Sequence, residues 1–170
     1  TGKVGVYTVV PGPGLLNTTA ALCTAWACNS PVLAISGQVH MAGIDSGYGH
    51  LHEIPDQLGL IRHLTKWAER INHPSLTPEI MARAFTELRS GRPRPVEIEM
   101  PMDVMGAEAE VAPAHFAAAA EPPPVDMDLV KAAARVLATA KRPMIVIGSG
   151  VFNAVPEVLA VAERLQAPVV

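Results

Sequence analysis

The chain has 170 residues, of which 49% are hydrophobic, and a formal net charge of -3 at pH 7. This length suffices for one domain, or for one domain and part of another, with a large buried core. The weak negative charge argues against nucleic acid and anionic membrane surfaces as partners. No apolar run reaches the roughly 18 residues that span a bilayer, and no signal peptide opens the chain, so we expect a cytoplasmic protein.

In the first 100 residues, apolar β-branched runs alternate with helical patterns. Runs over 3–10 and 31–36 predict two buried parallel strands, and the segment 17–29 between them predicts a helix capped by Asn17 or Thr18. These three elements form a predicted βαβ unit. The remaining predicted elements are a short helix over 56–63, a strand over 64–71, an amphipathic helix over 77–90, and a strand over 95–101 with one wet face, near a sheet edge.

The composition changes at Gly106, where an Ala- and Pro-rich stretch without periodicity predicts an extended linker over 106–125. After the linker we expect a helix from Asp126 or Asp128 to Ala140, a buried strand over 142–150, a helix over 155–165 and the start of another strand. The sequence therefore predicts an α/β domain with a parallel sheet over 1–105, the linker, and the beginning of a second, Rossmann-like α/β domain over 126–170.

Two prolines and two glycines alternate in the loop between the first predicted strand and helix, VVPGPGLLN at 9–17. Such a loop lies at the carboxyl edge of a parallel sheet, where α/β proteins bind ligands. Gly12 and Gly14 can adopt positive φ and expose their N–H groups, while Pro11 and Pro13 restrict the loop. The sequence fits neither a lysine-containing phosphate loop nor a three-glycine dinucleotide loop. Close contact with a flat or anionic ligand and a purely structural tight turn are the two alternatives.

A second loop, over 37–56, is long for a compact domain and contains His40, His50 and His52. A neutral imidazole near pH 7 can accept or donate a proton. The alternative is that these histidines are ordinary polar loop residues. A zinc site built from them is the weakest interpretation, because no third ligand has a convincing spacing, and we predict no metal ligands.

Several blocks of the sequence, in their order, resemble the pyrimidine-binding domain of thiamine-diphosphate-dependent enzymes, in particular the acetolactate-synthase-like group. The blocks are Gly5-Val6-Tyr7, Gly12-Pro13-Gly14-Leu15-Leu16-Asn17, Ala25-Trp26, Ser30-Pro31-Val32, Ser36-Gly37-Gln38-Val39, Leu51-His52-Glu53-Ile54, Leu64-Thr65-Lys66-Trp67, GRPRPV at 91–96 and Pro101-Met102-Asp103-Val104. Arg142-Pro143 and Gly148-Ser149-Gly150 resemble the opening of the central domain of that family. The resemblance covers nearly the whole chain.

The resemblance implies the thiamine-diphosphate-binding fold, in which two such domains from different subunits enclose thiamine diphosphate with Mg²⁺ on its diphosphate. It assigns Gly12, Pro13 and Gly14, with Asn17 beside them, to cofactor contact, and it implies a homodimer or homotetramer. The activating glutamate and the diphosphate-binding motif of the family would lie outside this sequence, so we expect an internal window of a longer enzyme that is inactive alone. The turn at 148–150 resembles the place where some members begin to hold FAD.

Departures from the family pattern concern the substrate side of the expected site. Acetolactate synthases tend to carry Phe-Gln-Glu where this chain has Leu51-His52-Glu53, and His40 stands where Pro is common. We therefore expect a catalytic His52, with His40 and Leu51 on the substrate side. The resemblance implies decarboxylation, C–C cleavage or carboligation of a 2-oxo acid or acyloin. Alternatives are an oxalyl- or hydroxyacyl-CoA type of decarboxylase or lyase, and a non-catalytic α/β domain for cofactor binding or assembly.

Overall fold

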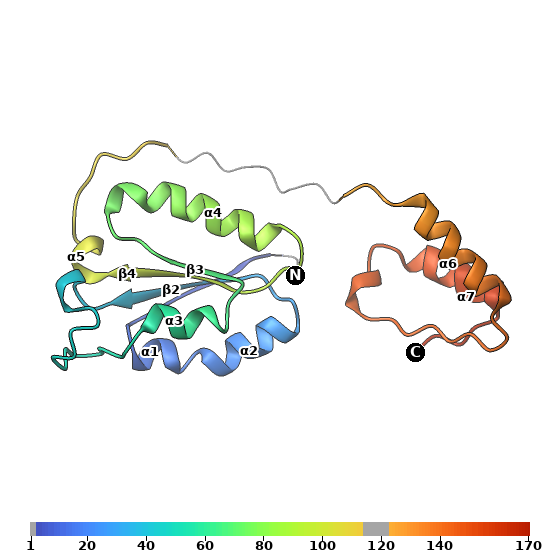
Figure 1. The fold of residues 1–170 in the computed structure, drawn as a ribbon, viewed down its shortest axis with the longest axis horizontal. Coiled ribbons are helices and arrows are strands. Elements are labelled where there is room, and N and C mark those ends of the chain that lie inside the picture. The colour runs from blue at the N-terminus through green and yellow to red at the C-terminus, as the bar shows by residue number, and fades with distance from the viewer. Residues whose placement is uncertain (1–2, 114–122) are drawn as a thin grey trace. The chain divides into compact units, whose positions relative to one another are not determined.

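The computed structural model describes residues 3–113 and 123–170, and the chain divides into two compact units, Thr1–Pro122 and Pro123–Val170. The first unit contains a four-stranded parallel sheet in the order β1-β2-β4-β3, which confirms the predicted fold class (Figure 1). The strands are β1 (Gly5–Val9), β2 (Val32–Gln38), β3 (Trp67–Arg70) and β4 (Val96–Pro101). No helix in the described ranges is long and apolar enough to cross a membrane.

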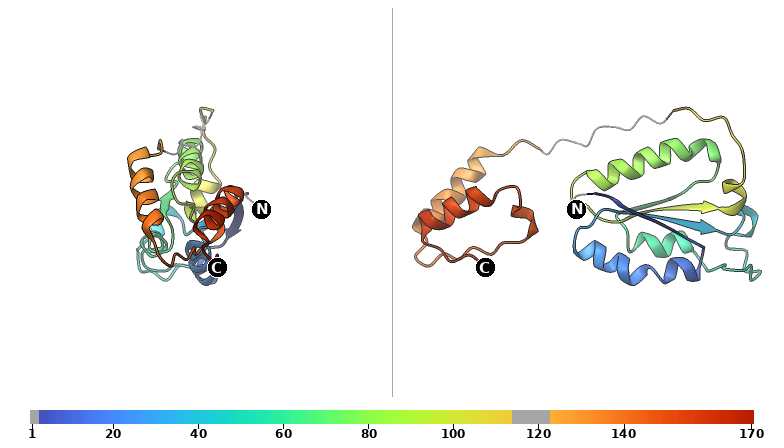
Figure 2. Two further views of the ribbon diagram at one scale, coloured as in Figure 1. Left: turned by 90° about the vertical axis from the view of Figure 1, so that its right-hand side faces the viewer. Right: turned by 180° about the vertical axis from the view of Figure 1, so that it is seen from behind.

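Helices cover both faces of this sheet (Figure 2). Along one face lie α1 (Pro13–Leu16), α2 (Thr19–Ala27) and α3 (Gln57–Arg62). On the other face lies α4 (Thr77–Arg89), and the short α5 (Met102–Met105) directly follows β4. Two 3-10 turns, Met41–Gly43 and Pro74–Leu76, complete the unit. The predicted helices over 56–63 and 77–90 are therefore confirmed.

Local chemistry explains where these helices begin and end. Asp56 precedes α3 in the left-handed conformation (φ 42°), and its carboxylate accepts the Gly59 N–H at 2.9 Å, which caps the first turn. At the carboxyl end of α4, the Lys66 ammonium donates to the carbonyls of Glu87 and Ser90, both at 2.6 Å. A cation at this position satisfies free carbonyls and complements the helix dipole.

The hydrophobic core consists of two clusters, one on each face of the sheet. Leu33, Ile71, Leu88, Val96 and Ile98, all at most 1% exposed, belong to the cluster beneath α4. The cluster beneath α1–α3 is built from Leu15, Leu22, Ile61 and Ala68. The parallel sheet is therefore covered on both sides, as parallel sheets require.

Two predictions about the strands of the first unit are wrong. The alternating segment at 95–101 is not near an edge with one wet face: β4 lies between β2 and β3, and both Glu97 and Glu99 are fully buried. Its charged positions alternate because they face other buried polar side chains, not water. The strand predicted as buried over 3–10 is the edge strand β1, on which Val6 is 56% exposed, because β2 is its one partner among the described residues.

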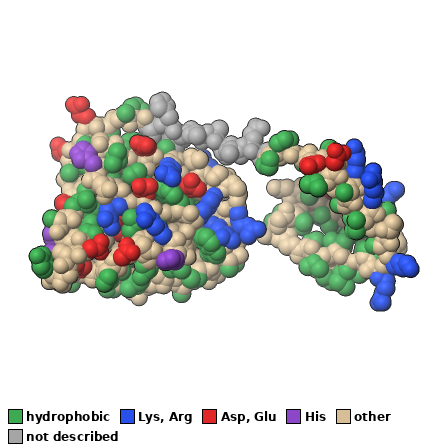
Figure 3. Space-filling view, in the orientation of Figure 1, with side chains coloured by type: hydrophobic (Ala, Val, Ile, Leu, Met, Phe, Trp, Pro, Cys, Tyr) green, Lys and Arg blue, Asp and Glu red, His purple; other side chains and the backbone are tan. Residues whose placement is uncertain are grey.

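The second unit contains α6 (Met127–Thr139), a 3-10 turn at Ser149–Val151 and α7 (Val155–Leu165). Asp126 caps α6 by accepting the N–H groups of Asp128 at 2.9 Å and Leu129 at 3.2 Å, as predicted. The buried strand expected over 142–150 is instead a single parallel bridge between Ile145 and Val169, and Val146 is 77% exposed. Figure 3 shows exposed hydrophobic side chains on this unit. Residues 114–122 of the predicted linker lie outside the described residues.

Replacing Ile98 with Ala should test the core beneath α4. The side chain is 1% exposed in β4, one of the two inner strands, so Ile98→Ala is expected to lower the free energy of unfolding by about 2–5 kcal/mol. Val6→Ala, on the exposed edge strand, should change it by no more than about 0.5 kcal/mol. Urea denaturation measures both variants, and equal losses would contradict the assignment of β4 as an inner strand and β1 as an edge strand.

Candidate functional site

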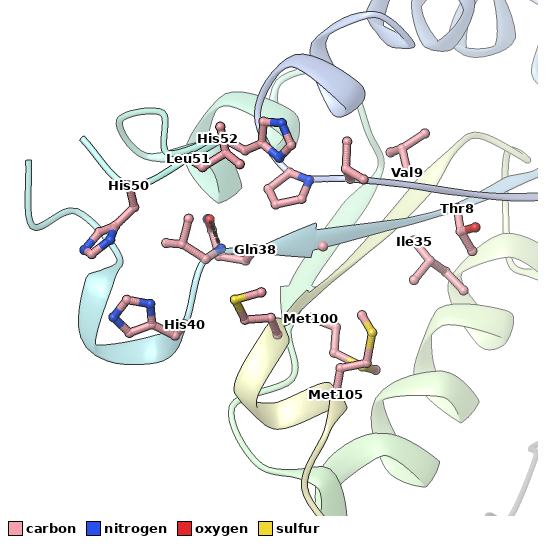
Figure 4. A pocket seen from close by; sticks show the side chains of 15 residues that line it. Thr8, Val9, Ile35, Gln38, His40, His50, Leu51, His52, Met100 and Met105 are labelled. Atoms are coloured by element: carbon pink, nitrogen blue, oxygen red, sulfur yellow. Dashed lines mark hydrogen bonds between the residues drawn. The ribbon is translucent and has the colours of Figure 1, made fainter. Parts of the chain in front are cut away.

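A pocket of about 710 Å³ lies at the carboxyl ends of β1, β2 and β4 (Figure 4). The loops that leave these strands, together with α5, provide its walls. Its lining residues are Thr8, Val9, Val10, Pro11, Ile35, Gly37, Gln38, Val39, His40, His50, Leu51, His52, Met100, Met102 and Met105. All of them belong to the first unit. The pocket therefore occupies the edge at which open α/β sheets bind ligands.

The lining is mostly apolar and carries three imidazoles. In Figure 4, the rings of His40 and His50 lie together at one end of the pocket, the His52 ring lies away from them although it is two residues from His50, and Met100 and Met105 also line the pocket. Within the described ranges, no Asp, Glu, Lys or Arg contributes to this lining. The pocket thus combines an apolar surface with groups that can exchange a proton near neutral pH, which suits a small organic ligand.

The Pro-Gly loop is held tightly beside the pocket. Gly12 is buried with φ at 54°, and a Cβ at this position would collide with the carbonyl oxygen of His52. The Gly12 N–H donates to the Gln57 side-chain oxygen at 2.7 Å. Gly14, in contrast, lies inside α1 and does not have positive φ, so the conformation predicted for both glycines is found at Gly12. Glycine is required at residue 12 both for φ and for space.

The structure brings together some of the residues that the sequence singled out. His40, Leu51 and His52 all line the pocket, whereas Gly12, Pro13, Gly14 and Asn17 do not, although their neighbour Pro11 does. Asn17 is exposed and ends α1, its N–H donating to the Pro13 carbonyl at 3.0 Å. It does not cap α2: Thr18 occupies the cap position, and its hydroxyl donates to the Leu15 carbonyl at 2.7 Å instead.

The loop over 37–56, here called the histidine loop, is ordered by carboxylates that do not line the pocket. Glu53 accepts the N–H groups of Gly47 at 2.8 Å and His50 at 2.9 Å, and these bonds lower the pKa of its carboxyl. Asp103 accepts the Met41 N–H at 3.1 Å. Glu53 therefore folds the loop, while the cap of the following helix is Asp56.

The imidazoles of His40 and His50 meet edge to face, with ring centroids 4.7 Å apart. Over the ranges that the structure describes, no group of three or more His, Cys, Asp or Glu side chains is placed to hold a metal ion. The arrangement of this loop therefore gives the zinc interpretation no support, and it leaves His52 separate from the paired imidazoles.

A buried polar cluster beneath the Pro-Gly loop was missed by the sequence analysis. Its members are Ser36, Gln38, Gln57, Glu97 and Glu99, each at most 3% exposed. Gln57 donates to Glu99 at 2.9 Å, and Ser36 donates to Glu97. The sequence signal that could have revealed this cluster is the pair of glutamates in the strand VEIEMP. Alternation of charged and apolar residues is, however, equally typical of a strand with one face in water. Buried polar groups need such partners.

The two buried glutamates differ in their environments. Glu99 forms an ion pair with Arg70 and also accepts from the Gln38 amide at 3.2 Å. Glu97 has one oxygen without a partner among the described residues. Burial raises the pKa of Glu97 to about 8, the negative charge of Glu99 adds to this effect, and the hydrogen bond from Ser36 opposes it. The raised pKa of Glu97 favours its neutral form at pH 7, while Glu99 is paired with Arg70.

Comparison with known proteins identifies two family models along this chain. Residues 1–60 match the thiamine pyrophosphate enzyme N-terminal TPP binding domain, and residues 130–170 match the thiamine pyrophosphate enzyme central domain. The chain is 39% identical to the probable 2-ketoarginine decarboxylase AruI of Pseudomonas aeruginosa, an alignment that covers 98% of this chain and 30% of the relative. It is 36% identical to the acetolactate synthase isozyme 1 large subunit of Escherichia coli, covering 98% of this chain and 29% of the relative.

A solved structure gives the same fold. The thiamine diphosphate-dependent 4-hydroxybenzoylformate decarboxylase of Rhodococcus jostii RHA1 superimposes with a TM-score of 0.84 at 23% identity, over 99% of this chain and 32% of the other. This chain thus spans about 30% of the length of the curated relatives.

The raised pKa of Glu97 predicts how the free energy of unfolding depends on pH. Because the folded pKa lies above the ordinary value of 4.5, the proton binds the folded state more tightly, and stability is expected to fall as pH rises from about 4.5 to about 8. The slope is at most about 1.4 kcal/mol per pH unit. Glu97→Gln cannot ionise and should become progressively more stable than the wild type between pH 5 and 8.

Urea denaturation at pH 5, 6, 7 and 8 measures this difference. Glu79→Gln is a suitable control, because it makes the same chemical change at an exposed carboxylate on α4. If Glu97→Gln and the wild type showed parallel stability curves over this range, the buried carboxyl would be ionised in both the folded and unfolded states.

Proposed function

The chain belongs to the thiamine-diphosphate-dependent enzymes, in an acetolactate-synthase-like group, and we propose that its pocket forms the substrate side of their active site. The proposed reaction is decarboxylation of a 2-oxo acid, followed by protonation of the product or its ligation to a second carbonyl compound. The observation that carries this proposal is the geometry of the loop: a buried, fixed Gly12 beside a largely apolar pocket that contains imidazoles.

The described residues fit the cofactor. The wall next to the loop is formed by Val9, Val10 and Pro11, an apolar surface against which a flat heteroaromatic ring can pack. When bound, thiamine diphosphate supplies the electron sink that stabilises the carbanion left by decarboxylation. We assign Gly12, Pro13, Gly14 and Asn17 to its contact surface. Mg²⁺ is proposed to accompany the diphosphate, away from this pocket, and FAD is a candidate ligand of the turn at 148–150.

The chain's own residues bind and orient the substrate and move protons. His52 is proposed as the catalytic acid or base, because it lines the pocket and its carbonyl lies next to Gly12. His40 and Leu51 are proposed to contact the remainder of the substrate. The apolar lining excludes water and so favours loss of a carboxylate from an oxo acid. Both curated relatives carry names that fit such chemistry, a probable 2-ketoarginine decarboxylase and an acetolactate synthase.

We further propose a cytoplasmic homodimer or homotetramer. Apolar side chains that line the pocket are exposed, among them Val10 at 55%, Met102 at 64% and Leu51 at 83%. Burial of such side chains by a second subunit would lower the free energy of the assembly. This arrangement would also close the pocket from the side at which it opens to solvent.

Gly12→Ala tests the role of the loop. The new Cβ would collide with the His52 carbonyl at a positive φ, so we expect the Kd for thiamine diphosphate, measured calorimetrically with Mg²⁺ in the full-length protein, to rise at least about tenfold. Gly91→Ala is a matched control, because Gly91 also has a positive φ of 56° but has no atom within 4 Å of the place that a Cβ would occupy. An unchanged Kd in Gly12→Ala would contradict cofactor contact at this loop.

His52→Asn tests the proposed acid or base. Asn tolerates the positive φ of 71° that His52 adopts, so the backbone should be retained while the imidazole is lost. We expect kcat for 2-oxo acid decarboxylation to fall about 100-fold, with an unchanged Kd for the cofactor. His63→Asn removes an exposed imidazole outside the pocket and should keep full activity. A His52→Asn enzyme with the kcat of the wild type would exclude this role.

A further inference from the structure

Gln57 occupies an unusual place for an amide side chain. It is the first residue of α3, is 1% exposed, and lies where this helix meets the carboxyl ends of β2 and β4. The preceding Asp56 fixes the start of the helix through its left-handed backbone and its bond to the Gly59 N–H. The Gln57 side chain is therefore directed into the sheet from a rigid element.

The Gln57 amide joins three segments that are distant in sequence. Its oxygen accepts the Gly12 N–H at 2.7 Å, and its nitrogen donates to the Gly37 carbonyl at 3.0 Å and to the Glu99 carboxylate at 2.9 Å. These partners lie 45, 20 and 42 residues away along the chain. One buried side chain thus connects the Pro-Gly loop with the ends of β2 and β4.

The surrounding groups fix the orientation of this amide. The Gly37 carbonyl and the Glu99 carboxylate can only accept hydrogen bonds, so they must face the Gln57 nitrogen. The carboxylate of Glu99 is itself held by Arg70 and by the Gln38 amide. The Gln57 oxygen is consequently left to face the Gly12 N–H, and the opposite orientation would place two donors against each other and acceptors against acceptors.

The loop is therefore clamped from two sides at Gly12. The His52 carbonyl fills the space that a Cβ would need, and the Gln57 oxygen holds the N–H. Loss of the amide would leave a buried N–H without a partner, which is costly enough to move the loop. The segment that carries Gly12, Pro13 and Gly14 would then shift relative to the pocket.

We propose that Gln57 is a positioning residue, which holds the Pro-Gly loop in the position relative to the ends of β2 and β4 that cofactor binding requires. This inference rests on the proposed function for its cofactor part, whereas its structural part concerns the loop alone. Gln57 does not line the pocket, so its effect on the ligand is exerted through Gly12.

Two substitutions at residue 57 and one control test the proposal in the full-length protein. Gln57→Leu removes all of the hydrogen bonds of the amide. Gln57→Glu can accept from the Gly12 N–H in either protonation state, but its single O–H can donate to Glu99 only while its carboxyl is protonated; once it ionises, it places a second carboxylate against Glu99, and the two charges repel each other. Ser36→Ala is the matched control: the Ser36 hydroxyl donates to Glu97 and accepts from the Gln57 nitrogen at 3.4 Å, so its removal leaves the Gln57 bonds to Gly12, Gly37 and Glu99 in place. Ser36 makes no contact with Gly12 among the described hydrogen bonds.

The first readout is hydrogen–deuterium exchange of the peptide that contains Gly12, without cofactor. We expect faster exchange there in Gln57→Leu than in the wild type or Ser36→Ala, with the peptides of α4 unchanged. The second readout is the Kd for thiamine diphosphate with Mg²⁺, which should rise about tenfold in Gln57→Leu and stay within about twofold in Ser36→Ala.

Gln57→Glu provides a readout that a general loss of stability would not produce. Burial and the neighbouring Glu99 charge raise the pKa of a carboxyl placed here, so the protonated form persists at lower pH. The cofactor affinity of this variant, relative to the wild type at each pH, should therefore fall as pH rises. The loss of cofactor affinity in Gln57→Leu, relative to the wild type, should be the same at every pH. The charged and titratable groups on the surrounding elements are Asp56, Tyr7, His52, Arg70, Glu97 and Glu99, and all of them are present in both Gln57→Glu and Gln57→Leu.

The outcomes separate this inference from the proposed function. Unchanged exchange at the Gly12 peptide in Gln57→Leu would overturn the positioning role itself. Faster exchange with an unchanged Kd would overturn the link to the cofactor. If the wild type bound no thiamine diphosphate at all, the proposed function would fail, while faster exchange in Gln57→Leu would still establish Gln57 as the residue that holds the loop.

Discussion

Pairing of buried polar groups beneath the Pro-Gly loop is the constraint on which the site depends. Glu99 accepts from Arg70 and Gln57, and Gln57 in turn accepts from the backbone of Gly12. A carboxylate at the centre of a sheet is costly unless it is matched in this way. Once it is matched, the loop above it has a single position, and the pocket beside the loop acquires a fixed wall.

The sequence predicts most of the fold because the responsible signals are local. The periodicity of the segment that becomes α4 and the cap at Asp126 depend on neighbouring residues in the chain, and both helices form where expected. The position of a strand in the sheet depends instead on partners far away in sequence. For this reason the strand with Glu97 and Glu99 was misplaced at an edge, and the exposure of the first strand was missed.

The candidate site was predictable to a similar extent. Motif resemblance led to the histidine loop, and the structure places His40, Leu51 and His52 around one pocket. Gln57 carried no comparable signal, because a glutamine after an aspartate at a helix start has many ordinary roles. Its importance comes from the convergence of three chain segments, which periodicity and spacing do not encode. Assignments of individual residues to cofactor or substrate remain predictions.

The side of the pocket away from the Pro-Gly loop is lined by flexible side chains. Three methionines, Met100, Met102 and Met105, line it from the end of β4 and from α5. Unbranched thioether side chains change shape at little cost and adapt to irregular partners. The pocket therefore pairs a wall at Pro11, next to the clamped Gly12, with a deformable wall of methionines. Ligands of different shape can be accommodated at the methionines while the wall at Pro11 keeps its position, so the range of ligands and the geometry of the loop can change independently of each other.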